Sequence, residues 1–387
     1  MGFTVLAVVC LVGLVGPILA LPQQWHLPIV LGELLAGVAL GRTGLGYLDS
    51  SDDTFTFLGE IGFALVMFVA GTHVPVRDPR LRPALWTGLQ RAAVVGVVAA
   101  GFGYGVASLV GTSHALLYAV LMASSSAAVI LPVRDSVGLD GHEVLELLPQ
   151  IALADAACIV LLPLAIDPGH AMRAGLGALA VVGCGVAAFL AFAWVERSGW
   201  RGRVHDVSEE RAFAVELRVS LTVLFAIAAV AVSLHVSIML AGFALGLAVS
   251  AVGEPRRVAK QLFAVTEGFF GPIFFVWLGA SLGVRSLASS PSMIWLGVCL
   301  GVGAALAHLV AVPLGQPVSL AMLASAQLGI PVAAATIGNQ LGVFRPGEGS
   351  ALVFGALLTL VVAVVGGGLA VRAGLVEAPS PAGEELA

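Results

Sequence analysis

The sequence predicts an all-α integral membrane protein of about thirteen spanning helices, organised as two inverted repeats. Three observations support this fold class. Of the 387 residues, 59% are hydrophobic and only 11% are charged, whereas soluble globular proteins carry about 25% charged residues. Apolar runs of roughly twenty residues recur along the whole chain, as a bundle of spanning helices requires. Finally, two stretches of the first half are echoed in the second half.

The apolar runs define the expected spans in chain order. Each run is long enough to cross a hydrocarbon core about 30 Å thick as a helix. They cover residues 3–21, 27–48, 55–73, 86–111, 114–134, 145–166, 174–195, 213–232, 235–251, 263–284, 293–315, 318–340 and 349–371.

Basic residues sort to one side of the membrane under this span count. Fourteen of the 18 Lys and Arg residues fall on one side, and the other side receives only Arg42, Arg173, Arg285 and Arg345. Cytoplasmic loops carry the excess of Lys and Arg. We therefore expect a multi-pass protein of the plasma membrane, with the N-terminus outside and the C-terminus in the cytoplasm.

The internal echoes have a nearly constant offset. HLPIVLGELLAGVALG at 26–41 matches HVSIMLAGFALGLAVS at 235–250, and FLGEIGFALVMFVAG at 57–71 matches FAVTEGFFGPIFFVWLG at 263–279. The offset corresponds to seven spans, an odd number, so the second copy is inverted relative to the first. Inverted repeats are typical of alternating-access transporters, whose substrate site lies near the midplane where the repeats meet.

Two spans contain helix-breaking sequences near their centres. The span at 114–134 contains Ser124, Ser125 and Ser126, and the span at 318–340 contains ASAQLGIP at 324–331. Such segments are close-packing surfaces in some membrane bundles. As a pair beside a buried carboxylate, they favour interrupted helices, whose freed carbonyls can ligate a hard cation.

Asp155 is the acidic residue near the middle of the 145–166 span. A charge at this depth costs about 2.5–3.5 kcal/mol on insertion scales, which points to a functional role. A proton and a cation can compete for such a carboxylate, and Ser124, Ser125 and Ser126 can add oxygen ligands. The alternative is a structural carboxylate that is hydrogen-bonded across helices.

His308 and Gln327 are weaker candidates in neighbouring spans. Histidine titrates near neutrality, so His308 is a candidate proton relay or hydrogen-bond partner of the site. A histidine satisfied within the core is an equal alternative. Gln327 lies in the second interrupted span and is a candidate contact of the ion path.

At this point the residues resemble the monovalent cation:proton antiporters, in the branch of bacterial sodium/proton antiporters and potassium-efflux systems. The resemblance rests on the order of several stretches, among them LMASSSAAVILPV (121–133), IALADAACIV (151–160), PIFFVWLGASL (272–282) and ATIGNQLGVF (335–344). It implies thirteen spans, two crossed broken helices and a homodimer. It also implies one exchanger-type domain over 1–372, followed by a short cytoplasmic tail at 373–387. Within this domain, the core helices are expected at about 55–166 and 263–371, and the dimerisation helices at about 3–48 and 213–251.

Two departures from the family pattern bear on the mechanism. Members of the family typically carry two polar residues at the centre of the sixth span, where this chain has Ala154 and Asp155. Many also carry a basic residue, often Lys, where His308 stands here. Losing the first acid together with its Lys partner leaves neither as an unpaired buried charge.

These observations predict a secondary transporter that exchanges Na⁺ or K⁺ for H⁺ without net charge movement, using Asp155 as the shared site. Two alternatives remain open at this stage: a proton-coupled exporter of a small organic metabolite, and a membrane receptor or assembly subunit that does not transport. The sequence contains no glycine-rich phosphate loop, Cys-x-x-Cys or His-x-x-x-His motif. We therefore expect no enzyme activity, no cofactor, no nucleic-acid partner and no nucleotide-binding regulatory domain, with the transported cation as the only metal.

Overall fold

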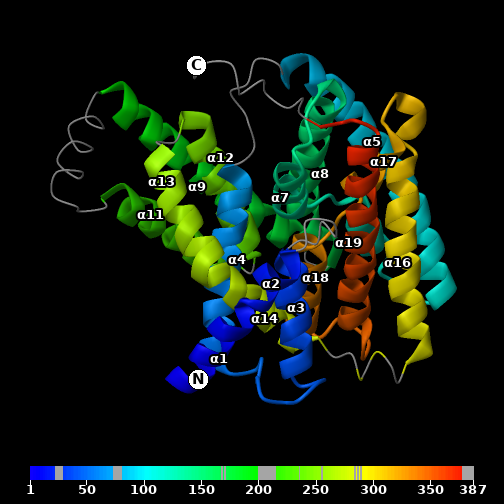
Figure 1. Ribbon diagram of the computed structural model, residues 1–387, viewed down its shortest axis with the longest axis horizontal. Coiled ribbons are helices and arrows are strands. Elements are labelled where there is room, and N and C mark those ends of the chain that lie inside the picture. The colour runs from blue at the N-terminus through cyan, green and yellow to red at the C-terminus, as the bar shows by residue number, and fades with distance from the viewer. Residues whose placement is uncertain are drawn as a thin grey trace, which may run out of the picture.

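The computed structural model describes residues 1–376, except for 22–28, 73–80, 167–168, 170, 199–214, 235, 254–255, 283–284, 286 and 288–289. The predicted tail at 373–387 therefore lies outside the described residues beyond Val376. Throughout the described part, the chain is helical and forms no β-strand longer than an isolated bridge between Leu139 and Val376. The all-α fold class is confirmed (Figure 1).

The first half of the chain forms helices at the positions of the predicted spans. In order they are α1 (Phe3–Gly13), α2 (Val15–Ala20), α3 (Ile29–Leu40), α4 (Asp53–Thr72), α5 (Leu81–Val110), α6 (Ala115–Ala123), α7 (Ala127–Val137), α8 (His142–Ile166) and α9 (Ala171–Arg197).

The second half follows the same pattern. In order its elements are α11 (Val215–Ser233), α12 (Ile238–Val252), α13 (Arg256–Val265), η3 (Thr266–Phe270), α14 (Gly271–Ser281), α16 (Pro291–Leu309), η4 (Val312–Leu314), α17 (Val318–Ala324), α18 (Gly329–Gln340) and α19 (Glu348–Arg372).

Ten helical segments among the described residues are long and apolar enough to cross a membrane, and α3 and α12 are shorter apolar helices. The interrupted pair α6 and α7 occupies the remaining predicted span. The protein is thus a multi-pass membrane protein, while the count of thirteen spans stays a prediction.

Two helix crossings relate the two halves of the chain. Gly37 of α3 meets Gly279 of α14, and Gly246 of α12 meets Gly71 of α4: a Cβ on any of the four would collide with backbone of the opposing helix. Gly246 lies 209 positions after Gly37, and Gly279 lies 208 positions after Gly71. Equivalent glycines therefore make reciprocal contacts, as an inverted repeat requires.

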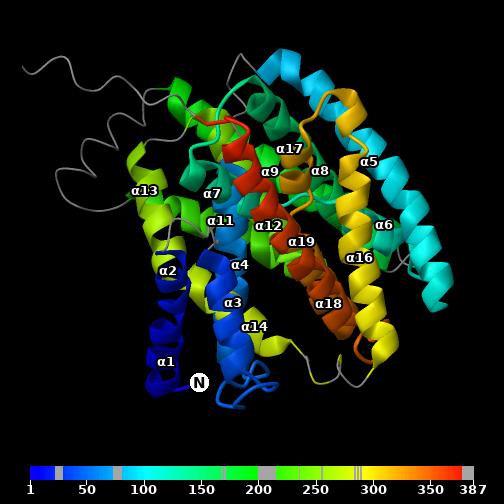
Figure 2. The same ribbon diagram turned by 45° about the vertical axis from the view of Figure 1, so that its right-hand side comes forward.

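The helices pack as two groups. One group gathers α3, α4, α11, α12 and α14 around the glycine crossings, and α9 packs on α12. The other group packs α5 against α6 and α8, and packs α16, α17 and α18 against α19. In Figure 1 the helices α9, α11 and α12 lie to the left and α5, α16 and α19 to the right. In Figure 2, α19 overlaps α9 and α12, while α5 and α16 remain on the right.

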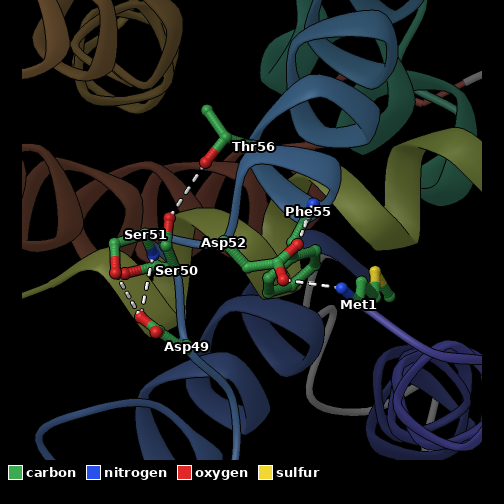
Figure 3. Close-up of polar contacts among 7 residues, drawn as sticks. All are labelled: Met1, Asp49, Ser50, Ser51, Asp52, Phe55 and Thr56. Atoms are coloured by element: carbon green, nitrogen blue, oxygen red, sulfur yellow. Dashed lines mark hydrogen bonds and ion pairs between the residues drawn. The ribbon is translucent and has the colours of Figure 1, made fainter.

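The carboxylate of Asp52 caps the N-terminus of α4 and holds the preceding loop in place (Figure 3). One oxygen accepts the N–H of Phe55 at 3.0 Å, and the other is 2.6 Å from the amino group of Met1. An aspartate at the N-cap satisfies an otherwise unpaired helix donor. The amino group and then the backbone donor hold the pKa of Asp52 below its usual range.

The same loop reaches the second half of the chain through the carbonyl of Ser50. This oxygen accepts the hydroxyl of Thr56 at 3.0 Å, shown in Figure 3, and the indole N–H of Trp277 at 3.2 Å. Asp49 accepts both the hydroxyl and the backbone N–H of Ser51, at 2.6 and 3.0 Å. The loop thereby fixes one edge of α14, whose Trp277 lines the cavity described below.

Candidate functional site

The two interrupted helices cross at their breaks. After α6 the backbone is extended at Ser124 and Ser126, and the chain resumes as α7. The N–H of Ser126 donates to the carbonyl of Ala326, in the other break, at 2.8 Å. The hydroxyl of Ser125 donates to the carbonyl of Ala324, the last residue of α17, at 2.7 Å. Both predicted interruptions, and the predicted crossing, are therefore present.

Asp155 lies beside this crossing, midway along α8, and is only 4% exposed. Its Oδ2 accepts the backbone N–H of Ala127, the first residue of α7, at 3.2 Å. The start of a helix presents unpaired N–H groups and the positive end of the helix dipole. The half-helix α7 is therefore oriented to stabilise the ionised carboxylate, while burial from water opposes ionisation.

The helix that carries Asp155 is itself irregular. Pro149 and Pro163 both lie inside α8, and each removes one backbone donor from the helical ladder. Asp155 sits between these two prolines.

His308 also reaches the crossing, from α16. It is 1% exposed, its Nδ1 lies 2.9 Å from the carbonyl of Ala304, and its Nε2 lies 3.2 Å from the hydroxyl of Ser125. His308 therefore contacts the predicted site at the hydroxyl of Ser125. Its described hydrogen bonds do not include one to the carboxylate of Asp155.

The three serines do not have equivalent surroundings, although all are at most 4% exposed. Ser124 donates to the carbonyl of Leu121 in its own helix at 2.8 Å. Ser125 bridges to α17 and α16, and Ser126 contributes its backbone N–H to the crossing. Their oxygen atoms retain lone pairs that can bind a cation.

Gln327 lies within the second break and is 4% exposed. Its backbone N–H donates to the hydroxyl of Thr359 on α19 at 3.0 Å, while its side-chain Nε2 has no hydrogen-bond partner among the described residues. A buried amide donor left in this way generally contacts water or a ligand. Thr359 was not identified from the sequence, because a single Thr in an apolar helix carries no distinguishing pattern.

A cavity of about 650 Å³ opens between the two groups of helices. One wall comes from Glu60 and Phe63 of α4, Trp277 of α14 and Arg173 of α9, and the opposite wall from α8 and α18. On α8 the lining starts at Pro163, eight residues and roughly 12 Å along the helix from Asp155. The cavity therefore lies towards the ends of α8 and α18 that are predicted to face outward, and Asp155 is not among its lining residues.

No cluster of three or more His, Cys, Asp and Glu side chains is found within the part of the chain that the structure describes. At the crossing, the described oxygen donors are one carboxylate, serine hydroxyls and backbone carbonyls. Such a set suits a weakly held alkali cation in transit, since hard cations prefer oxygen ligands.

Comparisons with known proteins agree with this architecture. The family described as "Sodium/hydrogen exchanger, transmembrane" matches residues 5–373. The Na⁺/H⁺-K⁺ antiporter GerN of Bacillus cereus is 22% identical over 292 residues, which cover 74% of this chain and 73% of GerN. The glutathione-regulated potassium-efflux protein KefC of Salmonella paratyphi B is 26% identical and covers 81% of this chain.

Some relatives are considerably longer than this chain. It spans 51% of the length of KefC and 44% of the Na⁺/H⁺ antiporter NhaS5 of Synechocystis, which is 26% identical. Among solved structures, the sodium proton antiporter MjNhaP1 of Methanocaldococcus jannaschii superposes with a TM-score of 0.66 at 14% identity, covering 97% of this chain and 98% of MjNhaP1. That likeness shows a shared fold. With the family matched over nearly the whole chain, this protein belongs to the transmembrane sodium/hydrogen exchangers, a family of transporters and not of enzymes.

Proposed function

We propose that the protein exchanges Na⁺ or K⁺ for H⁺, with Asp155 binding the cation and the proton in competition. One observation carries this proposal: a buried carboxylate lies at the crossing of two interrupted helices and accepts a hydrogen bond from the start of α7. A partly desolvated carboxylate favours the proton, and an arriving cation favours the ionised form. Because one group cannot hold both, release of one accompanies binding of the other.

The rest of the proposed ligand set comes from the breaks. Ser124, Ser125 and Ser126 directly precede Ala127, whose N–H contacts Asp155. His308 and Gln327 support this set from α16 and the second break. Among the described residues at the crossing, the carboxylate supplies the only formal charge, so we propose one proton per cation and electroneutral exchange.

The motion that exposes Asp155 to each side in turn is proposed to be a displacement of one helix group against the other. The sequence assigned α4 and α14 to the moving core. We propose instead that both belong to the scaffold, because both pack around the glycine crossings with α3 and α12. The cavity supports this boundary, since α4 and α14 line one wall while α8 and α18 line the other.

We further propose that the scaffold forms a homodimer in the plasma membrane, with the N-terminus outside. The sorting of 14 of 18 basic residues to one side supports this orientation. With this orientation, the cavity would open towards the outer side.

Exchange in everted membrane vesicles tests the proposal. A fluorescent pH dye reports proton movement after addition of Na⁺, K⁺ or Li⁺. We expect Asp155→Asn to abolish the response, because loss of the charge removes a Coulomb attraction of about 4 kcal/mol at 4 Å and an effective dielectric of 20, roughly a thousandfold in affinity. Asn retains an oxygen for the Ala127 N–H, so the variant should fold.

Undiminished exchange by Asp155→Asn would refute the proposed site. The stoichiometry is tested separately in proteoliposomes with a clamped membrane potential. Electroneutral exchange predicts a turnover that does not respond to voltage, and a turnover that rises with voltage would contradict one-to-one coupling.

A further inference from the structure

Three elements meet at the hydroxyl of Ser125. Ser125 lies in the break that follows α6. Its Oγ lies 2.7 Å from the carbonyl of Ala324, at the end of α17, and 3.2 Å from Nε2 of His308 on α16. The other ring nitrogen of His308 lies 2.9 Å from the carbonyl of Ala304, one turn earlier in α16. Ser125 and His308 are each 1% exposed, so water does not compete freely for these contacts.

The protons available to these contacts can be counted. A carbonyl oxygen only accepts, so Nδ1 must carry the proton shared with Ala304, and Ser125 must donate to Ala324. A neutral imidazole has one N–H and a serine hydroxyl has one O–H. With its proton on Nδ1, His308 presents Nε2 as an acceptor. Two acceptors, Nε2 and the Ala324 carbonyl, then compete for the single hydroxyl proton of Ser125.

The neutral ring is the form that its surroundings favour. Both described contacts of His308 are to uncharged groups, a carbonyl and a hydroxyl. An unpaired charge buried in a membrane protein is costly. The competition for the Ser125 proton is therefore the resting condition of the site.

The carbonyl of Ala324 occupies a special position in this arrangement. It closes α17, and the last carbonyls of a helix have no donor within the helix and carry the negative end of its dipole. The preceding carbonyls of Met322 and Leu323 accept the backbone N–H groups of Ser325 and Ala326. The Ala324 carbonyl instead accepts the hydroxyl of Ser125.

We propose that His308 is a positioning residue that sets the cation affinity of the crossing by drawing the Ser125 hydroxyl away from the Ala324 carbonyl. When the hydroxyl turns to Nε2, the carbonyl becomes an oxygen ligand that is open to the transported alkali cation. When the hydroxyl turns back, the carbonyl is covered. This inference rests on the proposed exchange at Asp155 and adds a specific determinant of its affinity.

Two substitutions at His308 separate its two ring nitrogens. His308→Asn keeps an amide near the position of Nδ1, within reach of Ala304, but provides no acceptor for Ser125. The hydroxyl then stays on Ala324, and we expect the KM for Na⁺ and K⁺ to rise roughly fivefold to tenfold, the worth of one hydrogen bond, with a smaller change in kcat. His308→Gln places its amide oxygen near the position of Nε2, and its KM should stay within about twofold of the wild type.

A double-mutant cycle provides the decisive comparison. In a Ser125→Ala background no hydroxyl covers Ala324, so His308→Asn should leave the KM of that background unchanged. Ser124→Ala is the matched control, because the Ser124 hydroxyl donates to Leu121 within its own helix. In that background His308→Asn should raise the KM as it does in the wild type.

The measurements are initial rates of dye-reported exchange in everted vesicles with NaCl or KCl. An equal rise in KM with and without Ser125, or a His308→Gln variant that matches His308→Asn, would overturn the inference. Ser125→Gly and His308→Leu repeat the cycle if either first variant fails to reach the membrane. Wild-type vesicles that exchange neither cation would overturn the proposed function itself, whereas exchange that requires Asp155 but shows no Ser125–His308 coupling would overturn only this inference.

Discussion

Substitution of Gly279 by Ala tests the packing that defines the scaffold. Gly279 meets Gly37 where α14 crosses α3, and a Cβ built on Gly279 would overlap the carbonyl oxygen of Leu34. The colliding atom is backbone and not the end of a flexible side chain, so the two helices must move apart to accept one methyl group. Gly246→Ala, at the reciprocal crossing, meets the carbonyl of Phe68 in the same way.

The expected loss of stability follows from two opposing contributions. Overpacking a close contact costs about 1–3 kcal/mol. Replacing Gly by Ala in a helix returns up to about 1 kcal/mol of helix propensity. The net destabilisation should therefore be about 1–2 kcal/mol. For a chain of 387 residues, this corresponds to a fall of about 1–3 °C in the apparent Tm of the detergent-solubilised protein.

The control is Gly105→Ala on α5, where a Cβ meets no atom within 4 Å. This variant gains the same helix propensity without a collision and should melt at or above the wild-type temperature. Thermal unfolding of all three variants, followed by size-exclusion chromatography after heating, measures the difference. If the Tm values of Gly279→Ala and Gly246→Ala equal that of Gly105→Ala, the close approach of the helices and the reciprocal crossing are refuted.

Four other substitutions have defined outcomes. Glu60→Gln removes an acid from the cavity wall and should raise the KM for cations supplied from that side about twofold to fivefold, an effect that high salt suppresses. Arg173→Gln removes a positive charge from the same cavity and should lower this KM. Radiotracer uptake into oriented proteoliposomes measures both changes, and an unchanged KM in both variants would contradict the prediction. Glu348→Gln weakens the contacts of a fully buried carboxylate with His114 (2.6 Å) and Tyr118 (2.7 Å) and should cost about 1–3 kcal/mol, so an unaltered Tm would contradict this role. Asp52→Asn should lower the Tm at neutral pH but not in strong acid. The folded state lowers the pKa of the Asp52 carboxyl, so this group stabilises the fold above its ordinary pKa and loses that contribution as the pH falls through the lowered pKa. A Tm difference between variant and wild type that is independent of pH would contradict the ion pair.

The sequence carried enough information to locate the interrupted helices and the carboxylate beside them. Ser124 to Ser126 and the ASAQLGIP stretch are rich in small, polar and helix-breaking residues within apolar spans, and an unbroken helix does not need such residues there. The two echoed stretches likewise predicted the inverted repeat. Asp155 could be found because an acid within an apolar run of this length has few structural explanations.

The sequence could not predict which backbone groups of the two breaks meet at the crossing. The hydrogen bond from Ser126 to Ala326 joins backbone groups, and any residue pair could supply it, so no side-chain pattern records it. The contact of Asp155 with the N–H of Ala127 is invisible for the same reason. The boundary between scaffold and core that we propose depends on which apolar faces meet, and the apolar spans differ little in composition.

Buried polar pairs at the helix ends show a second limit. Arg91 is 2% exposed and donates to Glu146 at 2.8 Å, joining α5 to α8. Each residue, taken alone, resembles an ordinary charged residue near the end of a span. Only the packing of α5 on α8 brings them together as a partly buried pair, in which removal of Glu146 leaves the buried Arg91 charge uncompensated.

The pH dependence of the KM for the transported cation is the most direct test of competition at Asp155. If a proton and a cation exclude each other from one carboxylate, the apparent KM for Na⁺ or K⁺ should rise about tenfold for each unit of pH below the pKa of the site, while kcat at saturating cation stays constant. A KM that does not change with pH, or a kcat that falls while KM is constant, would show that the two ions occupy separate groups and would contradict the account.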